Sequence, residues 1–450
     1  MPFPAQQGEA QALLEQLQND LRRRSFSDKQ LEDTLSKLKV LGRDVGNATA
    51  IYDEAGVEAL GAYAFGQYSS DIRLEALRCL ANALLMLPQT RRSFINLGFD
   101  KKATDTLQRA SIDEEFPLSR LLFLLTYDPL IDLSTLIDKH SLADNIFKLL
   151  ERHAEALAKS SGHSSNPAFQ ETLRLIFNVT NVKAEYISKF CPAIIQLSRI
   201  LRYTAITSPP LQPPISLIIN ALANLDFDSA SLETDPESPV ALTKLMTILE
   251  QAIQQYSTAE LETIAIPLLT VLRSINDKAS PKMRKQMKAH LLPTDKERDQ
   301  PLGQSSSLAS QLLRLTTSAG LVNLPKAISG LMFELSDKDA SQYVHNVGYG
   351  YAAGYLMTNQ ISIPESAKNG QSTSASSRQV PINPVTGQRL DAEPVSDLPQ
   401  MTDEEKRREA ERLFVLFERL KATGVVDVKN PVEHARDEGR FEELSDSDSD

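Results

Sequence analysis

The sequence predicts an all-α fold, an armadillo/HEAT-like helical-repeat superhelix followed by a flexible linker and a C-terminal amphipathic helix. Apolar residues recur three and four apart, the helical period, from about residue 9 to 357. No run of alternating polar and apolar residues is long enough to build a sheet. Gly, Pro, Ser and Asn clusters interrupt the helical segments, at 160–167, 208–214 and 301–307.

A degenerate internal repeat underlies this helical pattern. The segments that can be superposed are LRCLANAL (77–84), RLLFLLTY (120–127), RLIFNVTN (174–181) and LIINALANL (217–225). Their equivalent positions Asn82, Leu124, Asn178 and Asn224 are spaced 42, 54 and 46 residues apart. A period in the forties is typical of armadillo and HEAT arrays, whose units stack into a superhelix with an extended concave surface. A bundle of unrelated helices is the alternative.

Four regions follow from the changes in composition. Residues 1–358 form the repeat array, and 359–400 are a linker rich in Ser, Pro, Asn and Gln. Residues 401–424 form a helix, with a capping box between Thr402 and Glu405 and a stop at Gly424. The apolar stripe of this helix consists of Leu413, Leu416, Phe417 and Leu420. Residues 425–450 are an acidic tail.

Bulk properties exclude several classes of protein. The chain is 41% hydrophobic and 24% charged, as ordinary folded proteins are. The net charge of -11 argues against nucleic acid as the main partner, because phosphate contacts need clustered Lys and Arg. Cys79 and Cys191 are the only cysteines, which favours a reducing compartment. Without a signal peptide or an apolar run long enough to span a bilayer, the chain is expected to be cytoplasmic, with no integral membrane segment.

Motifs of covalent catalysis are missing from the sequence. It contains no Walker A loop, no H-E-x-x-H, no G-x-S-x-G and no Cys/His group with metal-ligand spacing. Gly348, Gly350 and Gly354 do not form a dinucleotide fingerprint, and no strand precedes them. We therefore expect a protein that is not an enzyme of covalent chemistry and that uses neither metal nor cofactor.

Basic residues and asparagines share helix faces within the repeats. Arg78 precedes Asn82 by four residues, and Arg174 precedes Asn178 by four, so each pair lies on one face a turn apart. Lys39 and Arg43 have the same spacing. On inner helices these residues would form a groove with amides for a peptide backbone and cations for carboxylates. For any one of them, a solvated residue on an ordinary helix is an equal alternative.

Motifs spread along the chain resemble the synembryn family, cytosolic guanine-nucleotide exchange factors and folding chaperones of the α subunits (Gα) of heterotrimeric G proteins. The C-terminal ones are YVHNVGYGYAAGYLM (343–357), INPVTG (382–387) and MTDEEKRREAERLFVLFERL (401–420). Earlier ones, in the same order as in the family, are KVLGRD (39–44), LEALRCLANAL (74–84), RLLFLLT (120–126), LRLIFNVT (173–180), INALANL (219–225) and MRKQMKAHLLP (283–293). The ordered set covers about residues 30–424.

The resemblance implies that a concave groove captures the C-terminal helix of Gα, in its GDP-bound or nucleotide-free state, and stabilises the nucleotide-free state. Groove residues that match the family are Lys39, Arg43, Asn82, Phe177 and Asn178; geometry alone adds Arg78, Arg174 and Asn224. The turn Gly348–Tyr349–Gly350 and the helix bearing Leu413, Leu416, Phe417 and Leu420 resemble the part that lies against the Gα switch region and nucleotide domain. The protein is expected to be monomeric and to reach the plasma membrane through Gα.

One departure from animal members of the family concerns regulation. Their acidic, phosphorylatable stretch after the GYG motif is absent here, where 361–380 reads ISIPESAKNGQSTSASSRQV. Ser445 and Ser447 in the tail are alternative phosphosites, and a solubilising acidic tail is the other interpretation.

Two other functions compete with the family assignment. An armadillo adaptor such as a nuclear-import carrier typically pairs tryptophans with its asparagines, whereas this chain has no Trp. An enzyme that uses the GYGYAAG loop on a phosphate ligand is the third alternative.

Overall fold

The computed structural model of the chain is built of helices. It describes residues 4–159, 166–228, 238–362, 382–383 and 386–393, together with 402, 404–406, 408–409 and 412. Across these residues no β-strand occurs, only an isolated bridge between Ile382 and Arg389. The chain divides into two compact units, Met1–Ala392 and Glu393–Asp450. The predicted all-α helical-repeat class is confirmed.

The helices of the first half are α1 (Pro4–Arg23), α2 (Asp28–Leu41), α3 (Val45–Ile51), α4 (Glu54–Ala64), α5 (Ser70–Met86), α6 (Thr90–Asn96), α7 (Phe99–Leu107), α8 (Ile112–Leu125), α9 (Leu133–Lys139), α10 (Leu142–Lys159), α11 (Pro167–Val182), η1 (Ala184–Tyr186), α12 (Ile187–Phe190), α13 (Ala193–Tyr203) and α14 (Ile215–Ala223). Those of the second half are α16 (Ser238–Gln255), α17 (Thr258–Ile264), α18 (Ile266–Lys278), α19 (Pro281–Leu291), η2 (Asp295–Asp299), α20 (Leu308–Thr316), α21 (Asn323–Leu335), α22 (Ala340–Val347) and α23 (Tyr349–Thr358).

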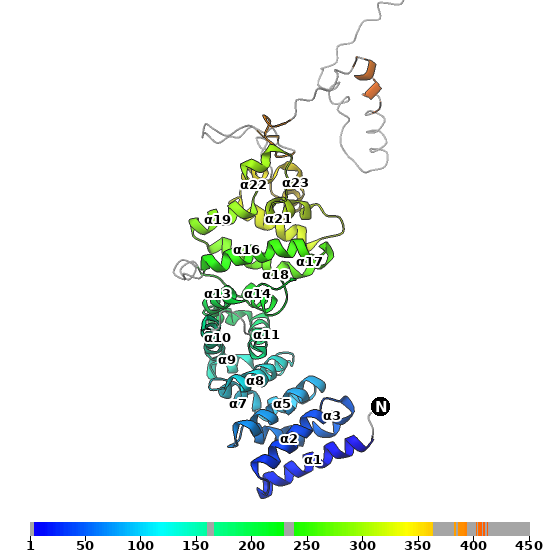
Figure 1. The fold of residues 1–450 in the computed structure, drawn as a ribbon, viewed down its shortest axis with the longest axis vertical. Coiled ribbons are helices and arrows are strands. Elements are labelled where there is room, and N and C mark those ends of the chain that lie inside the picture. The colour runs from blue at the N-terminus through cyan, green and yellow to red at the C-terminus, as the bar shows by residue number, and fades with distance from the viewer. Residues whose placement is uncertain are drawn as a thin grey trace, which may run out of the picture. The chain divides into compact units, whose positions relative to one another are not determined.

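Within the first unit the helices form two layers (Figure 1). In what we call the first layer, α2, α5, α8, α11, α14, α18 and α21 pack in this order, each against the next. The second layer covers it, with α4 on α5, α7 on α8, α10 on α11, α13 on α14 and α20 on α21. Each unit of the array thus buries its apolar faces against its neighbours, as the repeat predicts.

Local sequence signals set the ends of the first-layer helices. Capping boxes, Ser27 with Gln30 and Ser111 with Glu114, satisfy the free backbone N–H groups that begin α2 and α8. Gly42 ends α2 beneath the Tyr52 ring, and a Cβ at this glycine would lie 1.9 Å from the Tyr52 hydroxyl oxygen. No other residue fits there without moving Tyr52, so this glycine fixes where the chain leaves α2.

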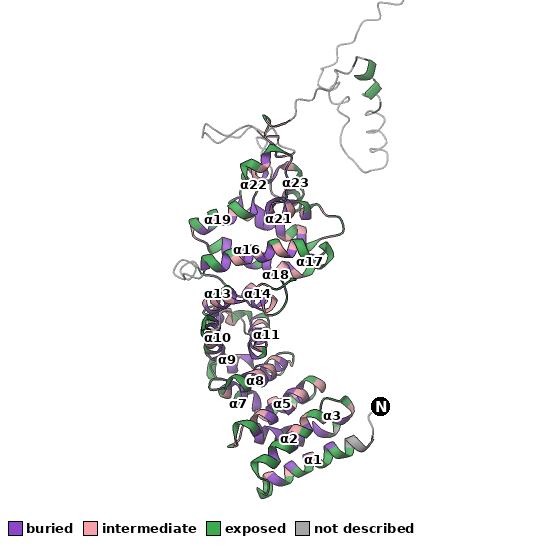
Figure 2. Ribbon diagram, in the orientation of Figure 1, coloured by how far each residue is buried: buried purple, intermediate pink, exposed green. Residues whose placement is uncertain are grey.

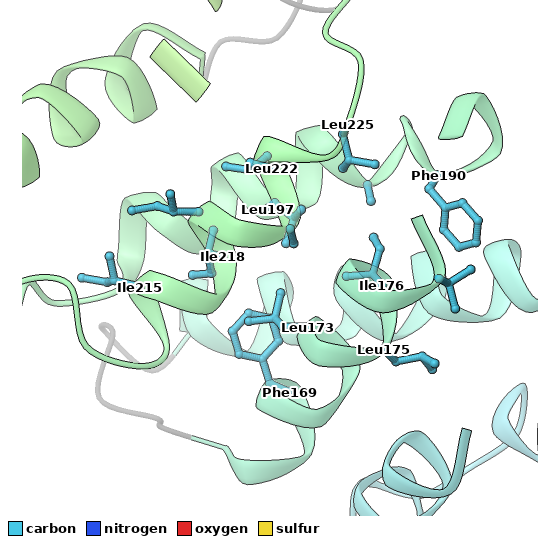
Figure 3. Close-up of a cluster of buried hydrophobic side chains, with 14 of the residues drawn as sticks. Phe169, Leu173, Leu175, Ile176, Phe190, Leu197, Ile215, Ile218, Leu222 and Leu225 are labelled. Carbon is cyan, nitrogen blue, oxygen red and sulfur yellow. The ribbon is translucent and has the colours of Figure 1, made fainter. Parts of the chain in front are cut away.

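The apolar core is continuous along the array. Buried residues lie where helices face one another, and exposed residues lie on the outer sides of the helices (Figure 2). Around α11 the core includes residues of both layers: Leu173 and Ile176 of α11, Ile218 and Leu222 of α14, and Leu197 of α13 (Figure 3). Burying one such side chain contributes about 1.5–3 kcal/mol, so inter-repeat contacts dominate the stability of the array.

The last helix of the array ends at Thr358. Gly348, at φ +82°, turns the chain from α22 into α23, which ends at Thr358. The sequence predicts a linker over 359–400, and several of its described residues between Asn383 and Ala392 hydrogen-bond to η2, to Leu302 or to one another. Composition alone could not reveal this docking, because backbone groups make most of the bonds.

Candidate functional site

One motif occurs twice in the first layer, on two helices that both pack against α8. Glu75, Arg78 and Asn82 lie on α5, and Glu171, Arg174 and Asn178 lie on α11, so both helices read E-x-L-R-x-x-x-N. The three positions fall on one helix face because they are three and four residues apart. Both glutamates are buried, whereas the arginine side chains are 41% and 32% exposed. The arginines and asparagines predicted from the sequence therefore share one layer.

Each buried glutamate holds two cations. Glu75 accepts a hydrogen bond from Lys39 Nζ at 2.5 Å and one from Arg78 Nη1 at 2.6 Å. Burial alone would raise the pKa of Glu75, but the bonds from Lys39 and Arg78 outweigh it and the pKa is lowered. Glu171 likewise lies 2.7 Å from Arg174 Nη1 and 3.7 Å from Arg120 Nη1. Each glutamate thus holds two partly exposed cations, and the three groups together have a net charge of +1.

The asparagines predicted to bind a peptide backbone instead join the repeats. Asn82 Nδ2 donates to the Lys39 carbonyl at 3.0 Å, and Asn178 Nδ2 to Thr126 Oγ1 at 2.9 Å. Asn224 Nδ2 donates to the Phe177 carbonyl at 3.1 Å. In each case the amide reaches the preceding first-layer helix. These bonds use the Nδ2 atoms of the three asparagines, so a bound peptide could be contacted only through the amide oxygens, as acceptors.

Arg43 is the most accessible of the predicted cations. It lies in the turn after α2, exposed, and its guanidinium makes no hydrogen bond or ion pair with any residue the structure describes. Asp44 next to it caps α3 by accepting from the backbone N–H groups of Gly46 and Asn47. The turn is therefore fixed while the Arg43 side chain projects free of it.

A pocket connects α8, α11 and α14 beside the second motif. It has a volume of about 220 Å³ and is lined by Phe123, Tyr127, Leu173, Arg174, Phe177, Asn178, Leu217 and Asn220. Its apolar walls include Tyr127, 58% exposed, whose ring meets Phe123 edge-on at 5.4 Å between centroids. Three predicted residues, Arg174, Phe177 and Asn178, thus line one cavity that offers apolar contact beside a cation.

The structure describes only part of the second predicted site, the one expected to contact the Gα switch region and nucleotide domain. Gly348 is buried, Tyr349 is half-buried against the core, and Gly350 is exposed at the start of α23. Leu413, Leu416, Phe417, Leu420, Ser445 and Ser447 lie outside the described residues.

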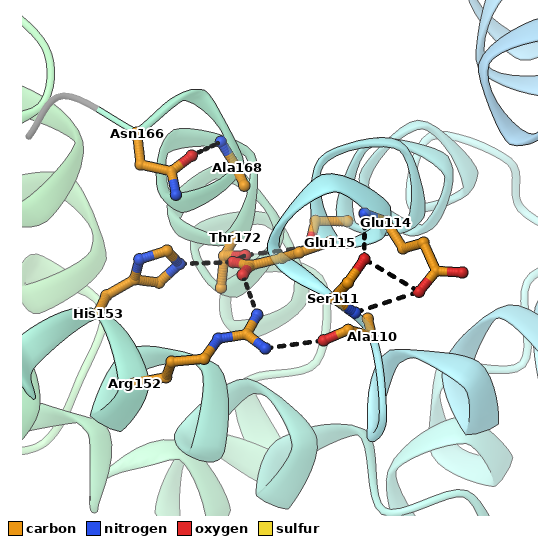
Figure 4. Close-up of polar contacts among 10 residues, drawn as sticks. Ala110, Ser111, Glu114, Glu115, Arg152, His153, Asn166, Ala168 and Thr172 are labelled. Atoms are coloured by element: carbon orange, nitrogen blue, oxygen red, sulfur yellow. Dashed lines mark hydrogen bonds and ion pairs between the residues drawn. The ribbon is translucent and has the colours of Figure 1, made fainter. Parts of the chain in front are cut away.

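A buried polar network behind the site has no counterpart in the sequence predictions. Glu115 of α8, fully buried, accepts from His153 Nε2 at 2.8 Å, Arg152 Nη2 at 2.5 Å and Thr172 Oγ1 at 2.8 Å (Figure 4). Thr172 also shares a 3.0 Å hydrogen bond with Ser119. Burial raises the pKa of Glu115, but these hydrogen bonds outweigh it and lower the pKa. The network joins α8, α10 and α11 and so orients the helix that carries Arg174.

Three further properties of the described residues bear on their chemistry. They contain no group of His, Cys, Asp and Glu that could hold a metal ion. Burial raises the pKa of the Cys79 thiol, which makes it a poor nucleophile. None of the described helices has both the length and the apolar character needed to cross a membrane. What the site offers is recognition: fixed cations, amide oxygens and an apolar pocket.

Comparison with known proteins agrees with the sequence motifs. A family model described as guanine nucleotide exchange factor synembryn, Ric8, matches residues 34–440. The synembryn-like chaperone of Schizosaccharomyces pombe is 23% identical and covers 90% of this chain and 83% of its own length. Chaperone Ric-8A of Bos taurus is 24% identical over 87% of this chain and 81% of its own. Chaperone Ric-8 of Drosophila pseudoobscura is 25% identical over 79% and 71%.

Proposed function

This chain belongs to the synembryn family of guanine nucleotide exchange factors, and we propose that it is an exchange factor and folding chaperone for G protein α subunits. The observation that supports this assignment most directly is the pair of E-x-L-R-x-x-x-N helices, which bring cations and an apolar pocket to one layer. A helix that ends in a carboxylate and carries large apolar side chains fits such a surface. The C-terminal helix of Gα is that ligand.

Different residues of the proposed site bind different parts of the Gα helix. Arg43 and Lys39 receive the carboxylate end of the Gα helix, since Arg43 is exposed and has no partner among the described residues. Arg78 and Arg174, held by Glu75 and Glu171, bind further carboxylates with little loss of side-chain freedom. Phe177 and the pocket beside it take one apolar side chain. Asn82, Asn178 and Asn224 contribute their amide oxygens.

Exchange follows from thermodynamic linkage. A protein that binds the Gα C-terminal helix more tightly when that helix is displaced must weaken GDP binding by the same factor. A thousandfold effect needs a differential affinity of about 4 kcal/mol and no reacting group. The same hold on nucleotide-free Gα protects it during folding, because a ligand stabilises the state that it binds. We place the protein in the cytoplasm as a monomer, recruited to the plasma membrane through Gα.

A charge reversal at the end of the site tests the proposal. In Lys39→Glu/Arg43→Glu each lost charge-assisted bond costs roughly 1.5–3 kcal/mol, so Gα binding falls at least a hundredfold. The measurements are titration of a Gα C-terminal peptide and the rate of GDP release from purified Gα. Lys148→Glu is the matched control, because Lys148 is exposed on α10 in the second layer. Unchanged binding by the double variant, or no acceleration of GDP release by the unaltered protein, contradicts the proposal.

A further inference from the structure

A short segment after the array is fastened to the array's end. We call residues 382–393 the strap; its described residues are 382–383 and 386–393. The Arg389 N–H donates to the Arg298 carbonyl at 2.8 Å, and the Leu302 N–H donates to the Thr386 carbonyl at 3.0 Å. Gln388 Nε2 reaches the Asp299 carbonyl at 3.1 Å. These bonds link residues that are far apart in the sequence. Thr386 belongs to the INPVTG motif (382–387), and Gln388 and Arg389 directly follow it.

Arg298 is the buried centre of this junction. It is only 4% exposed, and its Nη1 donates to the Gly387 carbonyl at 3.0 Å. Its Nη2 donates to the carbonyls of His345 and Asn346, at 2.9 and 3.1 Å. Those carbonyls belong to the last turn of α22, where the helix dipole favours a cation. One guanidinium therefore ties together η2, the end of α22 and the strap.

The strap also covers the glycine turn. Gly387 has φ +69°, a conformation that favours glycine. A Cβ on it would lie 2.4 Å from Leu302 Cδ1 and 3.6 Å from the Cα of Gly348. Gly348 thus faces the strap, while Gly350 remains exposed at the start of α23. The strap fits only while residue 387 has no side chain.

We propose that the strap is an anchor that fixes the C-terminal part of the chain to the end of the array, with Arg298 as its positioning residue. The inference rests on the proposed exchange activity and deepens it. The residues predicted to contact the Gα switch region, from Leu413 to Leu420, follow the strap in sequence. A docked strap shortens the stretch of chain between those residues and the end of the array.

Tether length gives the size of the effect. With the strap docked, about 10 residues separate its last residue, 393, from residue 403. Once the strap is released, the last attached residue is 361, and about 42 residues separate it from residue 403. Effective concentration falls roughly as the −3/2 power of tether length, so release lowers it about eightfold to ninefold. Exchange that depends on the C-terminal segment slows by about that factor, while recognition of the Gα C-terminal helix on the first layer does not change.

Gly387→Val tests this without altering the array. A β-branched residue is strained at positive φ, and its Cβ meets Leu302, so the strap is released. Hydrogen exchange reports release through the amides of Leu302 and Arg389, which we expect to exchange at least tenfold faster. Leu390→Ala is the control, because Leu390 is 49% exposed within the same strap. Arg298→Met is a second way to release the strap, because it removes the bond to the Gly387 carbonyl. Hydrogen exchange at the amides of Leu302 and Arg389 measures this release as well.

The expected result is a split between two activities. In Gly387→Val, GDP release from Gα slows about eightfold and the affinity for an isolated Gα C-terminal peptide is unchanged; Leu390→Ala matches the unaltered protein in both. Faster amide exchange with unchanged GDP release overturns the anchoring role alone. Amides that are equally unprotected in all variants show that the strap is not docked, which also overturns it. An unaltered protein that never accelerates GDP release overturns the proposed function, and the anchoring role with it.

Discussion

At the scale of residues, charges in the first layer are held in place by groups beneath them. Glu75 and Glu171 each neutralise one of two cations, so those units offer less net charge than the count of Lys and Arg suggests. Arg43 keeps its full charge in solvent. Pre-organised arginines bind with less entropic cost, whereas the exposed one gives the larger response to charge reversal. The arginines held by Glu75 and Glu171 are thus the ordered ones, whereas Arg43 contributes charge that no described carboxylate neutralises.

The first residue-scale prediction concerns the asparagines. Asn178→Ala removes the hydrogen bond from α11 to Thr126 of the preceding helix, so the free energy of unfolding falls by about 1 kcal/mol. Urea denaturation followed by circular dichroism measures this. Asn220→Ala is the control, since Asn220 lines the same pocket but its side chain makes no hydrogen bond within the described part of the chain. Equal stability of both variants means that the amide does not join the repeats.

The second residue-scale prediction is a pH dependence centred on Glu115. Its folded-state pKa is lowered from 4.5, so the ionised carboxylate stabilises the fold above that pH, and this contribution disappears as the pH falls through the folded-state pKa. Glu115→Gln leaves Arg152 and His153 without their anion and costs about 3 kcal/mol at pH 7. Thermal unfolding from pH 7 to pH 3 should show the two proteins converging below pH 4.5. Glu250→Gln, on the exposed face of α16, should follow the unaltered protein throughout.

At the scale of elements, the sequence predicts where helices form better than it predicts which distant elements pack together. Helical periodicity and capping residues such as Ser27 and Ser111 predict the elements, because these signals are local. The repeated E-x-L-R-x-x-x-N would also have revealed Glu75 and Glu171 beneath the arginines. Nothing local predicts that Glu115 meets His153, or that the strap meets η2, since those contacts depend on how distant helices pack.

The element-scale prediction separates the C-terminal segment from the array. Deleting residues 401–450 should slow GDP release from Gα while binding of an isolated Gα C-terminal peptide stays unchanged, because the first-layer site lies entirely within the array. Fluorescence anisotropy of the peptide and nucleotide-release kinetics measure the two effects. A protein lacking only the acidic tail, residues 425–450, is the control. Loss of peptide binding in the longer deletion would place the segment in the peptide site.

At the scale of the whole molecule, the array is quasi-one-dimensional. Each first-layer helix packs chiefly on its neighbours, so stability is a sum over units and interfaces rather than a property of one closed core. The peptide-site residues run from Lys39 on α2 to Asn224 at the end of α14, whereas the glycine turn and the strap lie after η2. In the proposed function, recognition of Gα and the effect on its nucleotide therefore belong to separate stretches of the chain.

That separation predicts the behaviour of a fragment ending at residue 228. Truncation removes the α14–α18 and α13–α16 contacts but keeps the other interfaces among the preceding helices, so the fragment should fold with a lower melting temperature. It keeps Lys39, Arg43 and the pocket, so its affinity for a Gα C-terminal peptide should stay within about threefold, a difference under 1 kcal/mol. It should not accelerate GDP release. Calorimetry, peptide titration and nucleotide release measure the three quantities. A folded fragment that cannot bind the peptide would show that recognition needs helices beyond α14, and the division of the array into two functional stretches would be wrong.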